Sequence, residues 1–336
     1  MLLISSSRFE EHETPPGHPE RPERAALFGA VAKTWRDRLS IVEPRAATRE
    51  ELLRVHSAEH VRVISETNGR AAMLDPDTFT SPESYEIALL AAGAAVQAAE
   101  HALEAKETAF ALVRPPGHHA ERDRPMGFCL FNNVAVAAAA ALARGLSRVA
   151  VVDIDVHHGN GTQWMFFEDP RVLYVSTHQY PFYPGTGAAD EVGRGAGEGY
   201  TFNVPLEAGA TDADYAVVYM TIANLLERYA PELLLISAGF DAHLDDPLAS
   251  MRVTTAGYAA VIRLLKGAAL RARCPIALAT EGGYDLDALR GCLDATLTVL
   301  SEDAPVVITA DTKVAPRAER ALEAVRAAQK RFWGTL

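Results

Sequence analysis

The stretch that most constrains the fold of this chain is a short apolar segment followed at once by acidic and imidazole side chains. Residues 149–152 are apolar and mostly β-branched, which is typical of a strand buried on both faces. The residues that follow include Asp153, Asp155, His157, His158 and Asn160. Burying such groups without partners is costly, and residues two apart in extended backbone share one face. The stretch therefore predicts a metal site beyond the carboxyl end of a buried strand, where open α/β sheets bind ligands.

Strand and helix patterns alternate over most of the chain. We expect strands at 2–5, 109–113, 149–153, 172–177, 200–204, 233–237 and 276–279. Expected helices cover 22–39, 49–55, 58–67, 132–144, 162–167, 211–229, 254–271, 286–300 and 316–332, with a long alanine-rich helix that is capped at Ser81 and ends near residue 104. Such alternation predicts an α/β fold with parallel strands covered on both faces. Because no linker or repeat interrupts it, we predict a single domain over residues 1–336.

Composition narrows the class of protein. Asp and Glu number 44 against 32 Lys and Arg, and the net charge of −12 disfavours nucleic acid as a partner and weakly favours cationic substrates. The three cysteines, Cys129, Cys274 and Cys292, lie far apart in apolar contexts, so we expect no disulfide framework and a reducing compartment. Without a signal or membrane segment in the pattern, we expect a cytoplasmic protein with no membrane partner.

Further chemically reactive residues follow other expected strands. Residues 114–120 read R-P-P-G-H-H-A, residues 238–242 read A-G-F-D-A, and residues 281–285 read E-G-G-Y-D. An irregular segment, residues 180–187, reads Y-P-F-Y-P-G-T-G. Since parallel strands end at one edge of their sheet, we expect these His, Asp and Tyr side chains to meet at that edge.

These motifs, together with G-F-C-L-F-N-N at 127–133 and D-I-D-V-H-H-G-N-G at 153–161, resemble those of the zinc-dependent histone deacetylase superfamily. That superfamily includes bacterial class II-like histone deacetylases, acetylpolyamine amidohydrolases and acetoin-utilisation proteins. The resemblance extends from the loop at 18–24 to Tyr284. It implies a three-layer α/β/α arginase/deacetylase-type fold with a central, mainly parallel eight-stranded sheet.

The resemblance also assigns metal ligands. It implies that Asp155, His157 and Asp241 bind one catalytic Zn²⁺, and three protein ligands leave a fourth position for water. Fe²⁺ suits the same oxygen and nitrogen ligands, so the native metal stays open. A structural K⁺ is implied beside Asp153, Asp155, His157 and Ser176.

Two adjacent histidines are expected to differ in protonation. The resemblance pairs His118 with Asp153, and Asn160 takes the place where many family members pair an aspartate with the second histidine, His119. Because a neutral amide stabilises imidazolium less than a carboxylate does, we expect His119 to be neutral and to act as general base and then acid. His118 is then an electrostatic partner, while His158 is expected to be structural.

The remaining catalytic and channel residues also come from the resemblance. Tyr284 is expected to donate its hydroxyl to the developing oxyanion, with Gly282 and Gly283 allowing the turn that carries it. Further residues are expected to line the substrate channel (Phe128, Tyr183, Leu248 and Gly127) and the acetate-release cavity (Arg24). The channel departs from the common pattern at Tyr183, where phenylalanine is usual. Leu248 stands where a polyamine-selective relative carries glutamate.

We therefore expect a zinc-dependent amidohydrolase that removes acetyl or other short acyl groups from lysine side chains or small amines. An acetylpolyamine amidohydrolase is the alternative. More remote alternatives are a binuclear manganese ureohydrolase, since residues 241–245 fit D-x-H-x-D, and a module that binds acetylated amines without hydrolysing them. The sequence leaves a homo-oligomer open.

Overall fold

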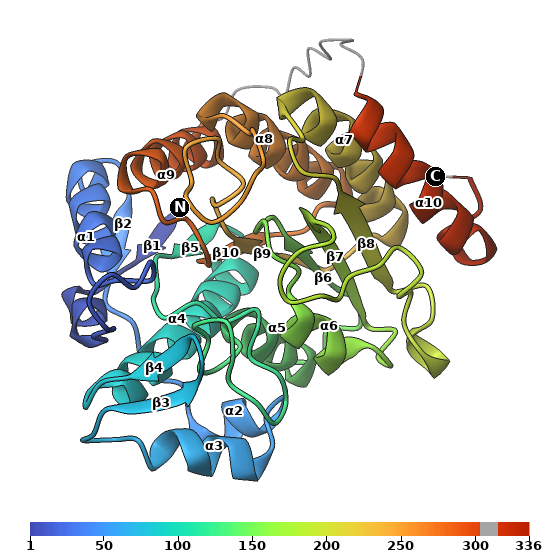
Figure 1. The fold of residues 1–336 in the computed structure, drawn as a ribbon. Coiled ribbons are helices and arrows are strands. Elements are labelled where there is room, and N and C mark those ends of the chain that lie inside the picture. The colour runs from blue at the N-terminus through green and yellow to red at the C-terminus, as the bar shows by residue number, and fades with distance from the viewer. Residues whose placement is uncertain (303–314, 336) are drawn as a thin grey trace.

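A twisted sheet of eight strands forms the centre of the molecule (Figure 1). The computed structural model describes residues 1–302 and 315–335. The strand order is β2-β1-β5-β10-β9-β6-β7-β8, and every pairing within this sheet is parallel. The strands are β1 (Leu2–Ile4), β2 (Ser40–Val42), β5 (Ala109–Ala111), β6 (Val149–Asp153), β7 (Val172–Gln179), β8 (Thr201–Leu206), β9 (Leu233–Ala238) and β10 (Ile276–Thr280). The mainly parallel eight-stranded sheet expected from the sequence is confirmed.

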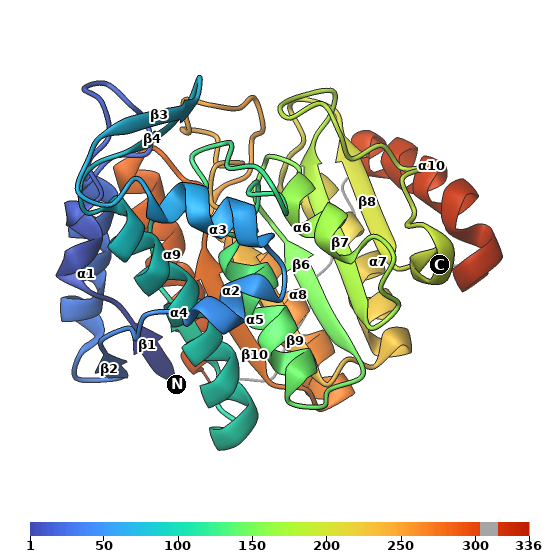
Figure 2. The same cartoon turned by 90° about the horizontal axis from the view of Figure 1, so that it is seen from below.

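Helices cover both faces of this sheet, as Figures 1 and 2 show from two directions. One face is covered by α1 (Glu23–Trp35), α7 (Asp212–Tyr229), α8 (Thr255–Ala272), α9 (Leu286–Ser301) and α10 (Pro316–Trp333). The other is covered by α2 (Arg49–Leu53), α3 (Ala58–Ser65), α4 (Ser84–Ala105), α5 (Asn133–Ala143) and α6 (Asn160–Phe166). A small antiparallel hairpin of β3 (Ala72–Asp75) and β4 (Thr78–Thr80), with the 3₁₀ turns η1 (Ser7–Glu11) and η2 (Gly195–Gly197), completes the three-layer fold.

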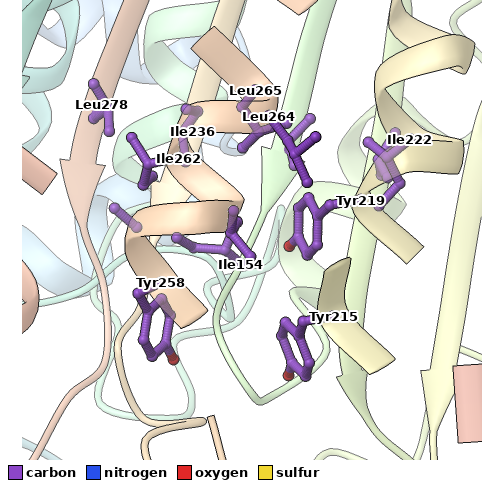
Figure 3. Packing of buried hydrophobic residues seen from close by; sticks show 14 of the residues in the cluster. Ile154, Tyr215, Tyr219, Ile222, Ile236, Tyr258, Ile262, Leu264, Leu265 and Leu278 are labelled. Carbon is purple, nitrogen blue, oxygen red and sulfur yellow. The ribbon is translucent and has the colours of Figure 1, made fainter. Parts of the chain in front are cut away.

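Two apolar cores form because strand side chains alternate between the faces. In β6, Ala150 and Val152 pack toward α7 and α8, whereas Val149 and Val151 pack toward α4 and α5. Figure 3 shows the first core, where aromatic side chains of α7 and α8 lie among isoleucines and leucines. The Tyr258 hydroxyl in this core accepts a 2.9 Å hydrogen bond from the N–H of Ala242, so the packed helix layer is tied to the loop that follows β9.

Most expected elements are present, with ends shifted by a few residues. The main error concerns α4, which begins at Ser84 rather than being capped at Ser81. The Ser81 hydroxyl instead accepts a hydrogen bond from Glu13 N–H and donates to the Glu11 carbonyl, both at 3.1 Å, and so holds the N-terminal segment. The short edge strand β2 and the β3–β4 hairpin were missed, because β2 and β3 are not buried and β4 has a single apolar residue, unlike the buried apolar strands β1 and β5. None of the helices in the described ranges is long and apolar enough to cross a membrane.

Candidate active site

Four loops meet at the carboxyl edge of the sheet. They follow β5, β10, β9 and β6, which are neighbours in that order, so segments far apart in the sequence become adjacent. The edge lies at the top of Figure 2, beside the β3–β4 hairpin. The loops bring together the residues that the sequence singled out after each strand.

A buried group of three ligand-type side chains lies at the centre of this edge. One ligand atom each from Asp155, His157 and Asp241 lies within 4.8 Å of the others. Backbone N–H groups hold the carboxylates, because Gly282 donates to Asp155 Oδ2 and Val156 donates to Asp241 Oδ1, each at 2.8 Å. A Cβ atom on Gly282 would lie 2.1 Å from Asp241 Oδ2, so this close approach requires glycine.

The chemistry of this group fits a divalent metal ion. Burial and the neighbouring charge of Asp155 raise the pKa of Asp241 to about 7, because two carboxylates in a dry site repel one another. A cation between them would offset that repulsion. One imidazole and two carboxylates suit Zn²⁺ or Fe²⁺ and leave coordination positions open. Within the part of the chain that the structure describes, this is the one such cluster of three or more His, Cys, Asp or Glu side chains.

The two adjacent histidines have different partners. His118 Nδ1 lies 2.9 Å from Asp153 Oδ2, and His119 Nδ1 lies 2.8 Å from Asn160 Oδ1, with the two ring centroids 4.1 Å apart. Burial lowers the pKa of His118, but the carboxylates of Asp153, Asp155 and Glu281 outweigh it and raise that pKa well above its usual value.

The surroundings of His119 lower its pKa, in contrast to those of His118. Burial, together with the charges of His118 and His157, lowers the pKa of His119 well below its usual value. Asn160 Nδ2 donates to Glu121 Oε1 at 2.7 Å, which turns the amide oxygen of Asn160 toward His119. Since that oxygen can only accept, His119 Nδ1 carries the proton and Nε2 is left as the basic nitrogen.

Tyr284 is held from both sides of its backbone. Its N–H donates to Asp246 Oδ2 at 2.7 Å, and the preceding residue, Gly283, has a φ of 122° that favours glycine. Arg24 Nε donates to the Gly283 carbonyl at 2.8 Å, and the Arg24 Cζ atom lies 5.1 Å from the Tyr284 ring centroid. Burial raises the pKa of Tyr284 well above its usual value, so the hydroxyl stays protonated and able to donate.

Aromatic rings surround this centre. The Phe128 ring meets Tyr284 edge-on at 5.9 Å between centroids, and the Tyr183 ring meets His119 edge-on at 5.1 Å. Phe182, which the sequence analysis did not assign, stacks on His157 at 5.4 Å. A Cβ atom on Gly127 would lie 2.4 Å from His119 Cδ2, so that backbone packs directly against the ring.

The other predicted residues lie around the same edge. Leu248 is half-buried and lines a cavity of about 580 Å³ together with Tyr284 and residues of the segment 14–23. Ser176 is the register partner of Asp153 in the neighbouring strand β7. Arg24 is fully buried and pairs with Glu20 at 3.0 Å.

Two further histidines have packing partners. His158 lies between Thr186 Oγ1 and Gln163 Oε1, each at 2.8 Å. His243, from the D-x-H-x-D pattern, lies 3.3 Å from Thr255 Oγ1 and is not part of the Asp155–His157–Asp241 group. The structure therefore does not assemble the ligand set of a binuclear site around this pattern in the described residues.

Several residues of the site escaped the sequence analysis. Glu121 and Asp246 reach it through contacts that no local motif encodes, whereas Phe182 lies in the segment 180–187, of which only Tyr183 received a role. Glu281 carried a signal, because it is the first residue of the E-G-G-Y motif, of which the sequence analysis interpreted only the last three residues.

A parallel sheet with helices on both faces, and with an Asp-His-Asp group, two histidines and a tyrosine at its carboxyl edge, defines a protein of the arginase/deacetylase fold class. A family model described as "Histone deacetylase domain" matches residues 18–300. The chain belongs to the histone deacetylase family, and it is thus related to hydrolases that act as deacetylases.

Individual relatives agree with this assignment. A "Probable deacetylase" of Archaeoglobus fulgidus is 39% identical over 293 residues, which cover 85% of this chain and 81% of the relative. "Histone deacetylase 15" of Arabidopsis thaliana is 40% identical over 313 residues, which cover 90% of this chain but only 56% of that longer protein. The crystal structure of the HDA15 HD domain matches with a TM-score of 0.91 at 36% identity and covers 99% of this chain and 95% of that one.

Proposed function

We propose that this chain is a zinc-dependent deacetylase that hydrolyses acetyl-lysine side chains or other short acyl amides of small amines. The observation that supports this most directly is the convergence of the Asp155–His157–Asp241 group with His119 and Tyr284 at one sheet edge. Membership of the histone deacetylase family supports the reaction class.

Asp155, His157 and Asp241 would hold the divalent ion. When bound there, such an ion lowers the pKa of a water molecule and polarises the amide carbonyl. A structural K⁺ is proposed beside Asp153, Asp155, His157 and Ser176, next to the same loop. Zn²⁺ is proposed as the native catalytic ion, with Fe²⁺ as the alternative that metal analysis would detect.

The two histidines divide the work of proton transfer and charge stabilisation. His119 takes the proton of the attacking water at Nε2, because its Nδ1 proton is directed at Asn160. It then donates that proton to the leaving amine. His118, held as imidazolium by Asp153, stabilises the negative charge that develops nearby.

Tyr284 and the aromatic walls complete the proposed mechanism. The Tyr284 hydroxyl donates to the oxyanion, and the turn at Gly282 and Gly283 presents it to the site. Phe128 and Tyr183 are proposed to pack on the methylene stem of the substrate and to keep water out. Arg24 is proposed to lie at the acetate-release cavity behind Tyr284.

The substrate is the part of the proposal that most needs a direct test. We favour acetyl-lysine over acetylpolyamines because Leu248, at the cavity beside Tyr284, offers no charge to a second ammonium group. The net charge of −12 favours a polyamine, but a bulk charge guides specificity less than a residue beside the substrate. The test compares kcat/KM for an acetyl-lysine peptide with kcat/KM for N-acetylputrescine and acetylspermidine. A preference for a polyamine above about tenfold, or about 1.4 kcal/mol of transition-state binding, would reverse the ranking.

A measurement of acetate release distinguishes a deacetylase from a module that binds acetylated amines without hydrolysing them. A His119→Ala variant should retain metal and fold but lose activity. If wild-type protein bound acetyl-lysine peptide without releasing acetate, or if the variant kept wild-type turnover, the proposed mechanism would be wrong.

A further inference from the structure

Glu281 is a buried carboxylate at the active site, and beyond its contribution to the raised pKa of His118 the proposed mechanism gives it no role. It is fully buried at the end of β10. Its Oε2 atom accepts hydrogen bonds from the N–H groups of Gly117 at 2.6 Å and His118 at 3.1 Å. Its Oε1 atom accepts a 3.0 Å hydrogen bond from the Ser237 hydroxyl at the end of β9. One side chain thus links the loop after β10 to the loop after β5 and to strand β9.

The chemistry of these contacts is unusual for a buried charge. All three donors are neutral, and the nearby Arg24 donates to the backbone carbonyl of Glu281 rather than to its carboxylate. The charged groups that face the carboxylate are His118, Asp153 and Asp155, and two of these repel it. Burial is the main reason why the pKa of Glu281 rises to about 7. With neutral hydrogen-bond donors and two neighbouring carboxylates, Glu281 does not act as a simple ion-pair partner.

The Glu281 carboxylate holds the backbone of the loop that carries His118 and His119. Two consecutive N–H groups aim at one oxygen, which fixes the orientation of the two peptide units on either side of Gly117. His118 and His119 follow directly, and their rings must face Asp153 and Asn160 respectively. A rotation of this backbone would displace both rings together.

We propose that Glu281 is the positioning residue of the histidine loop, and that it acts by accepting these two backbone hydrogen bonds. The inference rests on the proposed function, since it assumes that His118 and His119 act in catalysis. The requirement is for a hydrogen-bond acceptor at this place, and the negative charge itself is secondary.

Two variants of similar size separate these contributions. Glu281→Gln keeps an oxygen for the N–H groups of Gly117 and His118, and its amide can donate to Ser237. Glu281→Met fills the same space but offers no acceptor. Displacement of a catalytic group by about 1 Å costs on the order of 100-fold, so we expect Glu281→Met to lower kcat about 100-fold while KM and metal content stay near wild type. We expect Glu281→Gln to recover kcat to within about tenfold of wild type, because the geometry is retained.

The chain offers a matched control at the opposite edge of the sheet. Glu232 Oε2 accepts from the consecutive N–H groups of Ser147 and Arg148 at 2.7 and 2.9 Å, just before β9 and β6 begin. Glu232→Gln and Glu232→Met repeat the same chemical changes away from the site. Neither should alter kcat, whatever small effect they have on stability.

A readout without turnover completes the test. In ¹H–¹⁵N spectra of the whole protein, the Gly117 amide proton should resonate far downfield in the wild type and in Glu281→Gln, and should move upfield in Glu281→Met. If Glu281→Gln lost as much activity as Glu281→Met, charge rather than the hydrogen bond would be responsible and the proposal would be overturned. Wild-type kcat in a folded Glu281→Met variant would overturn it as well.

Assays of the wild type and of His119→Ala in parallel distinguish failure of the proposed deacetylase function from failure of the positioning role of Glu281. An inactive wild type, or an active His119→Ala variant, would refute the proposed function itself. If both behave as expected and the Glu281 variants do not, only the positioning role fails. Should Glu281→Met not fold, the comparison of Glu281→Gln with wild type still decides, because loss of kcat there contradicts the proposal.

Discussion

Replacing Asn160 with aspartate should raise the pKa of His119 and so increase the fraction of its imidazole that is protonated. His119 Nδ1 lies 2.8 Å from Asn160 Oδ1, so the new carboxylate would contact the ring directly. An opposite charge at such a distance raises the pKa of a group of this kind by about 1–3 pH units, and each unit corresponds to about 1.4 kcal/mol. His119 starts well below its usual pKa, so the change moves the value back toward its usual range.

The direction of the kinetic effect follows from the proposed role of His119 as base. Only the unprotonated imidazole accepts the proton of water. Raising its pKa therefore shifts the acid limb of the pH profile of kcat/KM to higher pH by the same amount, about 1–3 pH units. At a pH on that limb, kcat/KM should fall about tenfold for each unit of pKa. The assay is kcat/KM on an acetyl-lysine peptide from pH 5 to 9, with ¹⁵N NMR titration of the His119 ring as a direct check.

Glu121 provides the control for this substitution. Asn160 Nδ2 donates to Glu121 Oε1 at 2.7 Å, so an aspartate at 160 would also place two carboxylates in contact. Adding Glu121→Gln restores a donor to that contact and removes the repulsion. The double variant should be more stable than Asn160→Asp alone and should keep the displaced acid limb. Superimposable pH profiles for wild type and a folded, metal-loaded Asn160→Asp variant would refute the neutral-base assignment.

The remaining predictions concern catalysis, metal and stability. Tyr284→Phe should lower kcat by about 10²–10³ with little change in KM, measured by steady-state kinetics, because it removes one donor to the oxyanion. Chelation should abolish activity and lower the Tm in differential scanning calorimetry, and Zn²⁺ should restore both, whereas Asp241→Asn should remove the Zn²⁺-dependent rise in Tm. Glu20 is fully buried, and although burial alone would raise its pKa, Arg114 lowers that pKa to about 2, so its contribution to stability should be complete above about pH 4.5 and disappear as pH falls toward 2. Glu20→Gln should cost about 3–5 kcal/mol in urea unfolding, since it leaves the buried guanidinium groups of Arg114 and Arg24 without a carboxylate partner. Leu265→Ala, in the fully buried core of Figure 3, should cost about 2–5 kcal/mol in the same assay.

The sequence predicted the order of the main strands and helices because apolar runs and helical periodicity are local signals. The stretch from Val149 to Asp153 is the clearest case, since all five residues are buried and form β6 with the expected bounds. The grouping of Asp155 with Asp241 could be anticipated because each follows a strand of one parallel sheet. The predicted cap at Ser81 failed, because the capping preference of a serine does not reveal that its hydroxyl has a more distant partner in the N-terminal segment.

Contacts between distant segments explain what the sequence could not show. The orientation of Asn160 depends on Glu121, and the backbone of Tyr284 depends on Asp246, and in both cases the spacing in sequence carries no pattern. Phe182 stacks on His157 because the segment after β7 folds back over the site. Aromatic residues in an irregular loop indicate a lining, but they do not indicate which ring faces which ligand.

Charge balance within the site connects the metal, the histidines and Glu281. Besides Asp246, which holds the backbone of Tyr284, the site contains the buried carboxylates of Asp153, Asp155, Asp241 and Glu281 around the metal group and the two histidines. The His118 imidazolium offsets one of these four negative charges, and a divalent ion in the Asp155–His157–Asp241 group would offset two more. The remaining charge would be met by the monovalent cation proposed beside Asp153 and Ser176, or by a proton on Glu281, whose pKa is raised to about 7. His119 is the one group of the site whose neutrality this balance requires, since a second imidazolium beside His118 would add repulsion without a carboxylate of its own. Asn160, which supplies a hydrogen bond without a charge, therefore serves the base better than an aspartate would at the same position.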